Sequence, residues 1–173
     1  MTSPAIPERR MLLEMFRRMV LIRRFEDYLY SLFLQGLVPG TLHQYQGQEA
    51  VAVGVCSALR SDDVIFSTHR PVGHVIAKGS SLRRIAAELW GKIDGCAGGK
   101  GGQMHLVDTS VGAFPSNAIV GANIPIATGA ALGFKCLHFG WLDFSGQAPL
   151  RRCLHLPIFH CRFAPRRPHP RQD

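Results

Sequence analysis

The patterning of the sequence changes at Lys135, and this change limits the size of the domain that the chain can form. Up to that residue, apolar side chains recur at the spacings of helices and strands. Residues 136–173 instead hold five of the eleven prolines, three of the five cysteines and four of the eight histidines. Proline interrupts both helices and strands. We therefore expect a folded domain over residues 1–135 and a disordered tail over residues 136–173.

The tail also differs from the body in its charges. It carries six Arg but no Lys and no Glu, so that half of the formal net charge of +8 lies in the last 38 residues. The net charge is therefore weak evidence about what the body binds. This composition is typical of translation in a shifted reading frame, and a genuine divergent tail is the alternative.

The cysteines and the first residues indicate where the protein functions. The five cysteines are odd in number and lack paired spacing, and the N-terminal residues contain Arg and Glu instead of the apolar segment of a secretory leader. No stretch is apolar enough to span a membrane; residues 118–134 come closest but are rich in Gly and Ala. We expect a cytoplasmic protein with reduced thiols.

Helical and strand patterns alternate through the body, which favours an α/β fold. A three- and four-residue apolar spacing predicts a long helix that Gly36 would terminate. The run "DVIFST" has the β-branched and aromatic residues of a buried strand. In chain order we expect helices over 7–35 and 47–59, a strand over 63–68, a helix over 80–92, a glycine-rich loop, and a helix from about Ile124.

The glycine-rich loop "GCAGGKGGQMHL" invites comparison with phosphate-binding loops. A Walker loop ending in Gly99-Lys100 would require Gly where the chain has Asp94, and Ser or Thr where it has Gly101. A dinucleotide fingerprint requires a strand directly before it, and here a helix precedes. We interpret the segment as a surface loop whose glycines permit positive φ or close backbone approach. No histidine or cysteine spacing predicts a metal site.

Three polar residues form the most specific group of candidates. His69 and Arg70 follow the predicted strand, at the strand end where ligands bind in open α/β sheets, and His43 precedes them in the chain. The guanidinium of Arg70 has the planar, permanently charged shape that suits a phosphate. Taken alone, Arg70 is as good a candidate for a structural ion pair as for a ligand contact.

Four motifs in order identify a resemblance: "GTLHQYQGQEAVAVG", "FSTHR", "GGKGGQMH" and "NAIVGANIPIATGAALGFK". Together they resemble the alpha subunits of thiamine-diphosphate-dependent 2-oxo acid dehydrogenases, such as the alpha chains of pyruvate and acetoin dehydrogenases. The resemblance runs from about Glu8 to Lys135. It implies that the chain forms the N-terminal, incomplete part of a thiamine-diphosphate-binding open parallel sheet with flanking helices.

The resemblance also implies roles for individual residues. His43 would lie beside the reacting centre as the catalytic residue, and His69 and Arg70 would lie near the cofactor's diphosphate. Main-chain groups of Ala118 and Val120 would contact the aminopyrimidine ring. Two positions depart from the family pattern, which usually has Gly at Ala118 and often has His at Val72.

The implied activity is oxidative decarboxylation of a 2-oxo acid, pyruvate in the first place, with acyl transfer to a lipoyl group. The implied partners are a beta subunit, in an alpha–beta heterotetramer, and a lipoyl acyltransferase. The family binds magnesium through a later Gly-Asp-Gly and an Asn that have no match after Lys135, so we expect the chain as written to be inactive. The alternative function is a small basic protein that binds nucleic acid through its Arg-rich tail.

Overall fold

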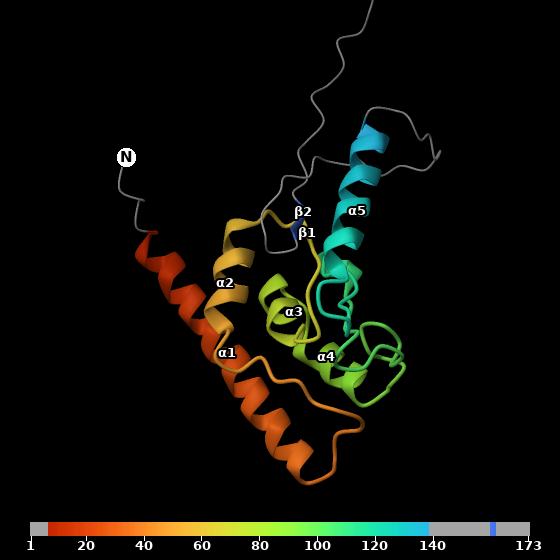
Figure 1. The fold of residues 1–173 in the computed structure, drawn as a ribbon. Helices are drawn as coiled ribbons and strands as arrows, with labels where there is room; N and C mark the ends of the chain where they lie inside the picture. The colour runs from red at the N-terminus through yellow and green to blue at the C-terminus, as the bar shows by residue number, and fades with distance from the viewer. Residues whose placement is uncertain (1–6, 139–159, 162–173) are drawn as a thin grey trace, which may run out of the picture.

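The computed structural model describes residues 7–138 and 160–161, and in this part of the chain helices predominate (Figure 1). Six helices and two short strands are arranged in the following order: α1 (Arg9–Leu34), α2 (Glu49–Ala58), β1 (Val64–Ile65), α3 (Val72–Lys78), α4 (Leu82–Leu89), the 3-10 helix η1 (Thr109–Val111), α5 (Asn123–His138) and β2 (His160–Cys161). None of the described helices is both long enough and apolar enough to cross a membrane.

Helix α1 confirms the predicted long helix and its termination at Gly36. Its buried residues Ile22, Glu26 and Leu29 lie on one face, at the spacing of a helix that packs along one side. Gly36 adopts a φ of 71°, and its amide bonds to the carbonyl of Phe33 at 2.9 Å. The amide of Leu37 bonds to the carbonyl of Leu32 at 3.0 Å. This pair of bonds satisfies the last carbonyls of the helix.

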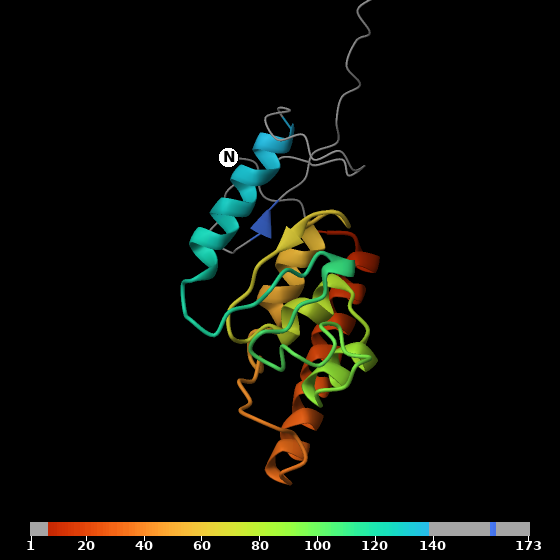
Figure 2. The same ribbon diagram turned by 90° about the vertical axis from the view of Figure 1, so that its right-hand side faces the viewer.

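The main core lies where α1, α2 and α3 pack together. The contacts among these helices and both views of the ribbon show this packing (Figures 1 and 2). Its fully buried side chains include Ile22, Tyr45, Val53, Val72 and Ile85. Helix α3 is not among the elements expected from the sequence, which places only His69 and Arg70 after the strand and assigns no structure to residues 72–78. Pro71 precedes the helix and Gly79, with a φ of 105°, follows it, so both ends carried ordinary helix signals.

The sheet differs from the predicted open parallel sheet. The strand expected over 63–68 is regular only in β1, which pairs antiparallel with β2, so that Val64 faces Cys161 and Ile65 faces His160. On its other side Ile65 forms a single parallel bridge with Ala113. A strand extends only as far as a neighbour supplies hydrogen bonds. Within the described residues, β1 has a paired strand along Val64 and Ile65 alone, and the strand is therefore two residues long.

Helix α5 lies to one side of the α1–α3 core, next to β1 (Figures 1 and 2). Its alanines and Phe134 pack on a second apolar cluster around Val64 and Phe66. The helix begins at Asn123, one residue before the predicted start, and continues past Lys135 to His138. The expected disordered tail lies outside the described residues except for its first three residues, which extend α5, and for β2.

Candidate functional site

His43 and His69 lie against each other, although 26 positions of the chain separate them. His43 belongs to the irregular segment between α1 and α2, and His69 to the turn between β1 and α3. Their ring centroids are 5.3 Å apart and the rings are nearly perpendicular, at 89°. The Nδ1 atom of each ring is buried and has no hydrogen-bond partner within the described residues. Two buried imidazole nitrogens are thus available to a ligand.

Arg70 stands directly beside this pair and holds the segment that carries His43. Its Nη1 donates a hydrogen bond to the backbone carbonyl of Gln44. Within the described part of the chain, no carboxylate forms an ion pair with Arg70, whereas Arg18, Arg23, Arg60 and Arg84 all have such a partner. The guanidinium therefore keeps most of its donors for an anion.

Glu26 lies buried in α1 behind the same segment. Its side chain is 0% exposed, and neither carboxylate oxygen has a hydrogen-bond partner among the described residues. Burial raises the pKa of this carboxyl to about 7. The backbone N–H of Tyr45, which is near the carboxylate but outside hydrogen-bonding geometry, and the charge of Arg70 lower that pKa in part, and the charge of Glu49 raises it further. Glu26 therefore titrates close to neutral pH.

Tyr45 and His74 form a second ring pair. The Tyr45 hydroxyl lies 3.5 Å from His74 Nε2, and the ring centroids are 5.0 Å apart. Burial lowers the pKa of His74 to about 4, so that this imidazole is neutral at physiological pH. The Tyr45 ring packs on the α-carbon of Gly73, where a Cβ atom would lie only 2.1 Å from the ring. This pair is part of the packing that supports the candidate site.

Ala118 and Val120 lie in the segment that leads into α5, and the structure does not join them by hydrogen bonds to the imidazoles or to Arg70 within the described residues. Val120 is 75% exposed and Ala118 is half-buried. The segment is fixed at both ends. Ser116 Oγ donates to the carbonyl of Met104 at 2.8 Å, and Asn123 Nδ2 donates to the carbonyl of Ser67. Asn123 thus ties the start of α5 to the residues just before His69.

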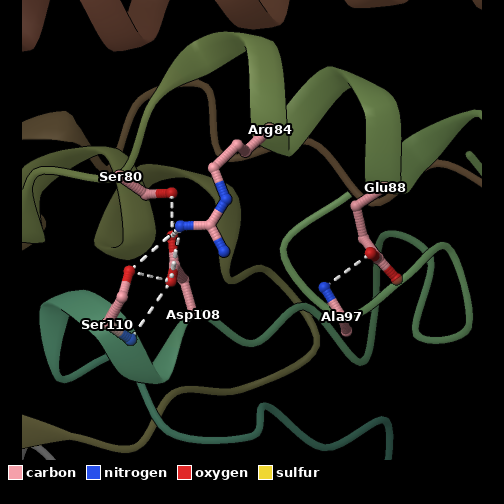
Figure 3. Close-up of polar contacts among 6 residues, drawn as sticks. All are labelled: Ser80, Arg84, Glu88, Ala97, Asp108 and Ser110. Carbon is pink, nitrogen blue, oxygen red and sulfur yellow. Dashed lines mark hydrogen bonds and ion pairs between the residues drawn. The ribbon is translucent and has the colours of Figure 1, made fainter. Parts of the chain in front are cut away.

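The glycine-rich loop closes around Glu88 of α4 rather than around an open anion site (Figure 3). One carboxylate oxygen of Glu88 accepts hydrogen bonds from the amides of Ala97 and Gly99, at 2.7 and 2.8 Å. The other accepts from Gly101 and Gly102, at 2.7 and 3.3 Å. Burial raises the pKa of Glu88, but these four bonds outweigh it and the net shift is downward. The loop's amides are thus bound to the chain's own carboxylate, which agrees with the rejection of a phosphate loop.

Asp108 fixes the chain that follows the loop (Figure 3). Its side chain is 1% exposed and accepts hydrogen bonds from Ser80 Oγ at 2.5 Å, from Arg84 Nη1 at 3.1 Å and from Ser110 Oγ at 2.5 Å. Burial raises the pKa of Asp108, but hydrogen bonds from the two serines and the charge of Arg84 lower it by more. Asp108 and Glu88 together hold the loop and its exit against α4.

Gln103, at the end of the loop, contacts the candidate site directly, and sequence reasoning missed it. Its side-chain amide accepts a hydrogen bond from the backbone N–H of His43 at 3.1 Å and donates one to the His43 carbonyl at 2.5 Å. The two residues are 60 positions apart. The only signal in the sequence was the position of Gln103 inside a motif that the resemblance already singled out.

The described residues contain no group of three His, Cys, Asp or Glu side chains that could hold a metal ion. Cys56 and Cys96 are free thiols, and burial raises the pKa of each to about 11, so that both are protonated at neutral pH. The candidate site consists of the imidazoles of His43 and His69, the guanidinium of Arg70 and the buried carboxyl group of Glu26. Such a site can bind an anionic ligand and hold a proton.

Comparison with known proteins identifies the family of the chain. A family model described as "Dehydrogenase E1 component" matches residues 17–148. The alpha subunit of acetoin:2,6-dichlorophenolindophenol oxidoreductase from Bacillus subtilis is 50% identical over 121 residues, which cover 70% of this chain and 36% of that protein. The pyruvate dehydrogenase E1 component subunit alpha from Zymomonas mobilis is 43% identical over 138 residues, 76% of this chain and 39% of that protein.

The chain spans about two fifths or less of the length of these curated relatives. The family match covers all the residues of the candidate site and continues beyond Lys135, where the regular patterning of the sequence ends. The chain belongs to the dehydrogenase E1 component family, among alpha subunits related to those of acetoin and pyruvate dehydrogenases.

Proposed function

We propose that this chain supplies the alpha-subunit side of a thiamine diphosphate site in a pyruvate dehydrogenase E1 component. The observation that carries the proposal is the meeting of His43 and His69, with Arg70 beside them, at the end of β1. Acetoin is a second candidate substrate, because the Bacillus subtilis relative at 50% identity carries acetoin in its name.

The residues at this site fit a cofactor that bears a diphosphate. The guanidinium of Arg70 would bind phosphate oxygens, and the unpartnered Nδ1 atoms of His43 and His69 are polar groups that a ligand would satisfy. Bound thiamine diphosphate supplies the carbanion chemistry of the reaction. His43 would orient the substrate at the reacting centre. Main-chain groups of Ala118 and Val120 would contact the aminopyrimidine ring.

Partners complete the proposed enzyme. We propose that a beta subunit joins the chain in an alpha–beta heterotetramer, and that a lipoyl acyltransferase receives the acyl group. The absence of magnesium ligands, expected because the family's Gly-Asp-Gly and Asn have no match after Lys135, stays a prediction. The expected inactivity of the chain as written and its expected location in the cytoplasm both stay predictions.

Replacement of Arg70 tests the proposed cofactor site. Isothermal titration with thiamine diphosphate and Mg²⁺, on a version of the chain with the reading frame restored after Lys135 and co-purified with a beta subunit, should show weaker binding for Arg70→Ala. The loss should be ~1.5–3 kcal/mol, or roughly ten- to 150-fold in dissociation constant, the contribution of a hydrogen bond to a charged group. Arg83→Ala is the matched control, because Arg83 is an exposed arginine of α4. Equal affinities of the two variants would contradict the proposal.

The same preparation distinguishes the two substrates. The complex that contains the frame-restored chain should decarboxylate pyruvate with a lipoyl acceptor, and acetoin added alone should give no acyl transfer, whereas the chain as written should be inactive with both. Turnover of acetoin without turnover of pyruvate would assign the chain to the second candidate substrate instead.

A further inference from the structure

The backbone of His43 depends on one side chain from a distant part of the molecule. His43 lies in a segment without regular secondary structure, and within the described residues both of its backbone hydrogen bonds go to Gln103. The amide group of Gln103 thus pairs with His43 as a neighbouring strand would, with one bond accepted and one donated. The Gln103 side chain is buried, at 8% exposed, so that water competes little for these bonds.

Gln103 can act in this way because the chain on both sides of it is fixed. Just before it, the amides of Gly101 and Gly102 are bound to Glu88. Just after it, the carbonyl of Met104 accepts the hydroxyl of Ser116 at 2.8 Å. Ser116 lies two positions before Ala118, so the same anchor also holds the segment that leads to α5. The position of Gln103 is therefore determined by α4 and by the approach to α5.

The glycines of the loop are required for its close approach to α4. A Cβ on Gly99 would lie 2.4 Å from the backbone of Gly91, and Gly99 has a φ of 75°. A Cβ on Gly95 would lie 2.4 Å from the Glu88 carboxylate. Larger residues would push the loop off the carboxylate and displace Gln103. The glycine content of the loop thus follows from its packing against α4, without any nucleotide phosphate.

We propose that Gln103 is a positioning residue for His43, and that Glu88 and the glycine-rich loop form the frame that holds Gln103 in place. This inference rests on the proposed function, in which His43 acts at the reacting centre. Gln103 itself need not touch substrate or cofactor. It sets where the His43 imidazole stands relative to His69 and Arg70, because the main chain of His43 has no other hydrogen-bonding support in the described structure.

The first test replaces Gln103 by methionine, whose side chain has a similar length but forms neither of the two hydrogen bonds. In the Gln103→Met variant of the full chain, hydrogen exchange of the His43 amide, followed by NMR, should be faster by about tenfold, as expected when a bond of about 1.4 kcal/mol is lost. The imidazole C2–H resonances of His43 and His69 should shift together, because the two rings are in contact. Gln46→Met is the control, since Gln46 is exposed and its side chain bonds, among the described residues, to Asp27 alone.

The second test uses the Gln103→Glu variant, which stays informative if Gln103→Met folds poorly. A protonated glutamic acid can still accept from the His43 amide and donate to its carbonyl, whereas an ionised carboxylate would set an oxygen against that carbonyl. Because residue 103 is buried, the charged form of a glutamic acid there is disfavoured and its pKa is raised. The His43 and His69 resonances of Gln103→Glu should therefore match those of the wild type near pH 5 and diverge from them near pH 8. A residue that only fills space would not produce this rescue.

The outcomes separate this inference from the proposed function. Unchanged His43 exchange and unchanged imidazole resonances in Gln103→Met would overturn the positioning role, whatever the cofactor affinity. The proposed function is tested separately by Arg70→Ala in the cofactor titration. If that variant binds thiamine diphosphate as the Arg83→Ala control does, the cofactor site fails while the NMR result on Gln103 still stands.

Discussion

Replacement of Glu26 by Gln should make the protein more stable at alkaline pH. Glu26 is 0% exposed, and burial raises its pKa from the ordinary 4.5 to about 7. The folded protein therefore keeps a proton that the unfolded chain releases between these two pH values. The stability that this proton contributes is fully present below pH 4.5 and is lost as pH rises to about 7. Above that pH, the folded state holds an ionised carboxylate with little compensation.

The size of the effect follows from the shift in pKa. The ordinary pKa of 4.5 and the raised pKa of about 7 differ by about 2.5, and each pH unit corresponds to about 1.36 kcal/mol, so the cost above pH 7 is on the order of 3 kcal/mol. The charge of Arg70 limits this cost, and the charges of Glu49 and Asp27 add to it. Gln has the same shape and stays neutral. Glu26→Gln should thus exceed the wild type in stability by roughly 2–3 kcal/mol at pH 8 and differ little from it near pH 4.5.

Urea denaturation of both proteins between pH 5 and pH 8 measures this difference. His74 titrates in the opposite sense, because its lowered pKa gives stability that is lost as pH falls from 6.5 towards 4. His74 is present in both proteins, so its contribution cancels in the comparison. Glu14→Gln is the control, as Glu14 is an exposed partner of Arg18. A difference between wild type and Glu26→Gln that stays constant with pH would refute the reasoning.

Two further substitutions test the packing around the site. Gly73→Ala should cost about 1–3 kcal/mol in urea denaturation, because the new methyl group would lie 2.1 Å from the Tyr45 ring, whereas Gly54→Ala in α2, which meets nothing within 4 Å, should add about 0.4–1 kcal/mol. Asp108→Asn should lower stability by about 1–3 kcal/mol at pH 7, since it removes the charge that Arg84 and two serines bind. Because the pKa of Asp108 is lowered, this loss should shrink as pH falls below 3.8, and a loss unchanged down to pH 2 would contradict the assignment.

The sequence was sufficient for elements that depend on local signals. The long helix and its termination at Gly36 follow from apolar spacing and from the left-handed conformation that glycine adopts there. Helix α3 was missed because its seven residues are too few for a clear periodic pattern. The sheet differed for another reason. Strand pairing joins residues far apart in the chain, and Ile65 meets Ala113 and His160, neither of which a local pattern predicts.

The candidate site likewise contains residues that the sequence indicates and residues that only the tertiary contacts reveal. The order of His43, His69 and Arg70 in family-like motifs was enough to single them out, and the structure brings them together. Gln103 was not found, because its role depends on a contact across 60 positions. Glu26 was not found either, since in the sequence it is one more charged residue in a helix rich in arginine.

Glu26 and Glu88 show why burial alone does not reveal the role of a carboxylate. Both are 0% exposed. Glu88 accepts hydrogen bonds from four backbone amides. These bonds lower its pKa, hold the loop in place and offset the cost of burying the carboxylate. Glu26 receives no hydrogen bond on its carboxylate among the described residues, and its pKa rises. A buried carboxyl group without hydrogen bonds lowers stability, so the rest of the fold must compensate for it. Such unsatisfied buried groups occur mainly at functional sites. The Glu26 carboxylate is close enough to Tyr45 and Arg70, in and beside the segment that carries His43, to interact with them electrostatically, whereas Glu88 holds the glycine-rich loop from α4.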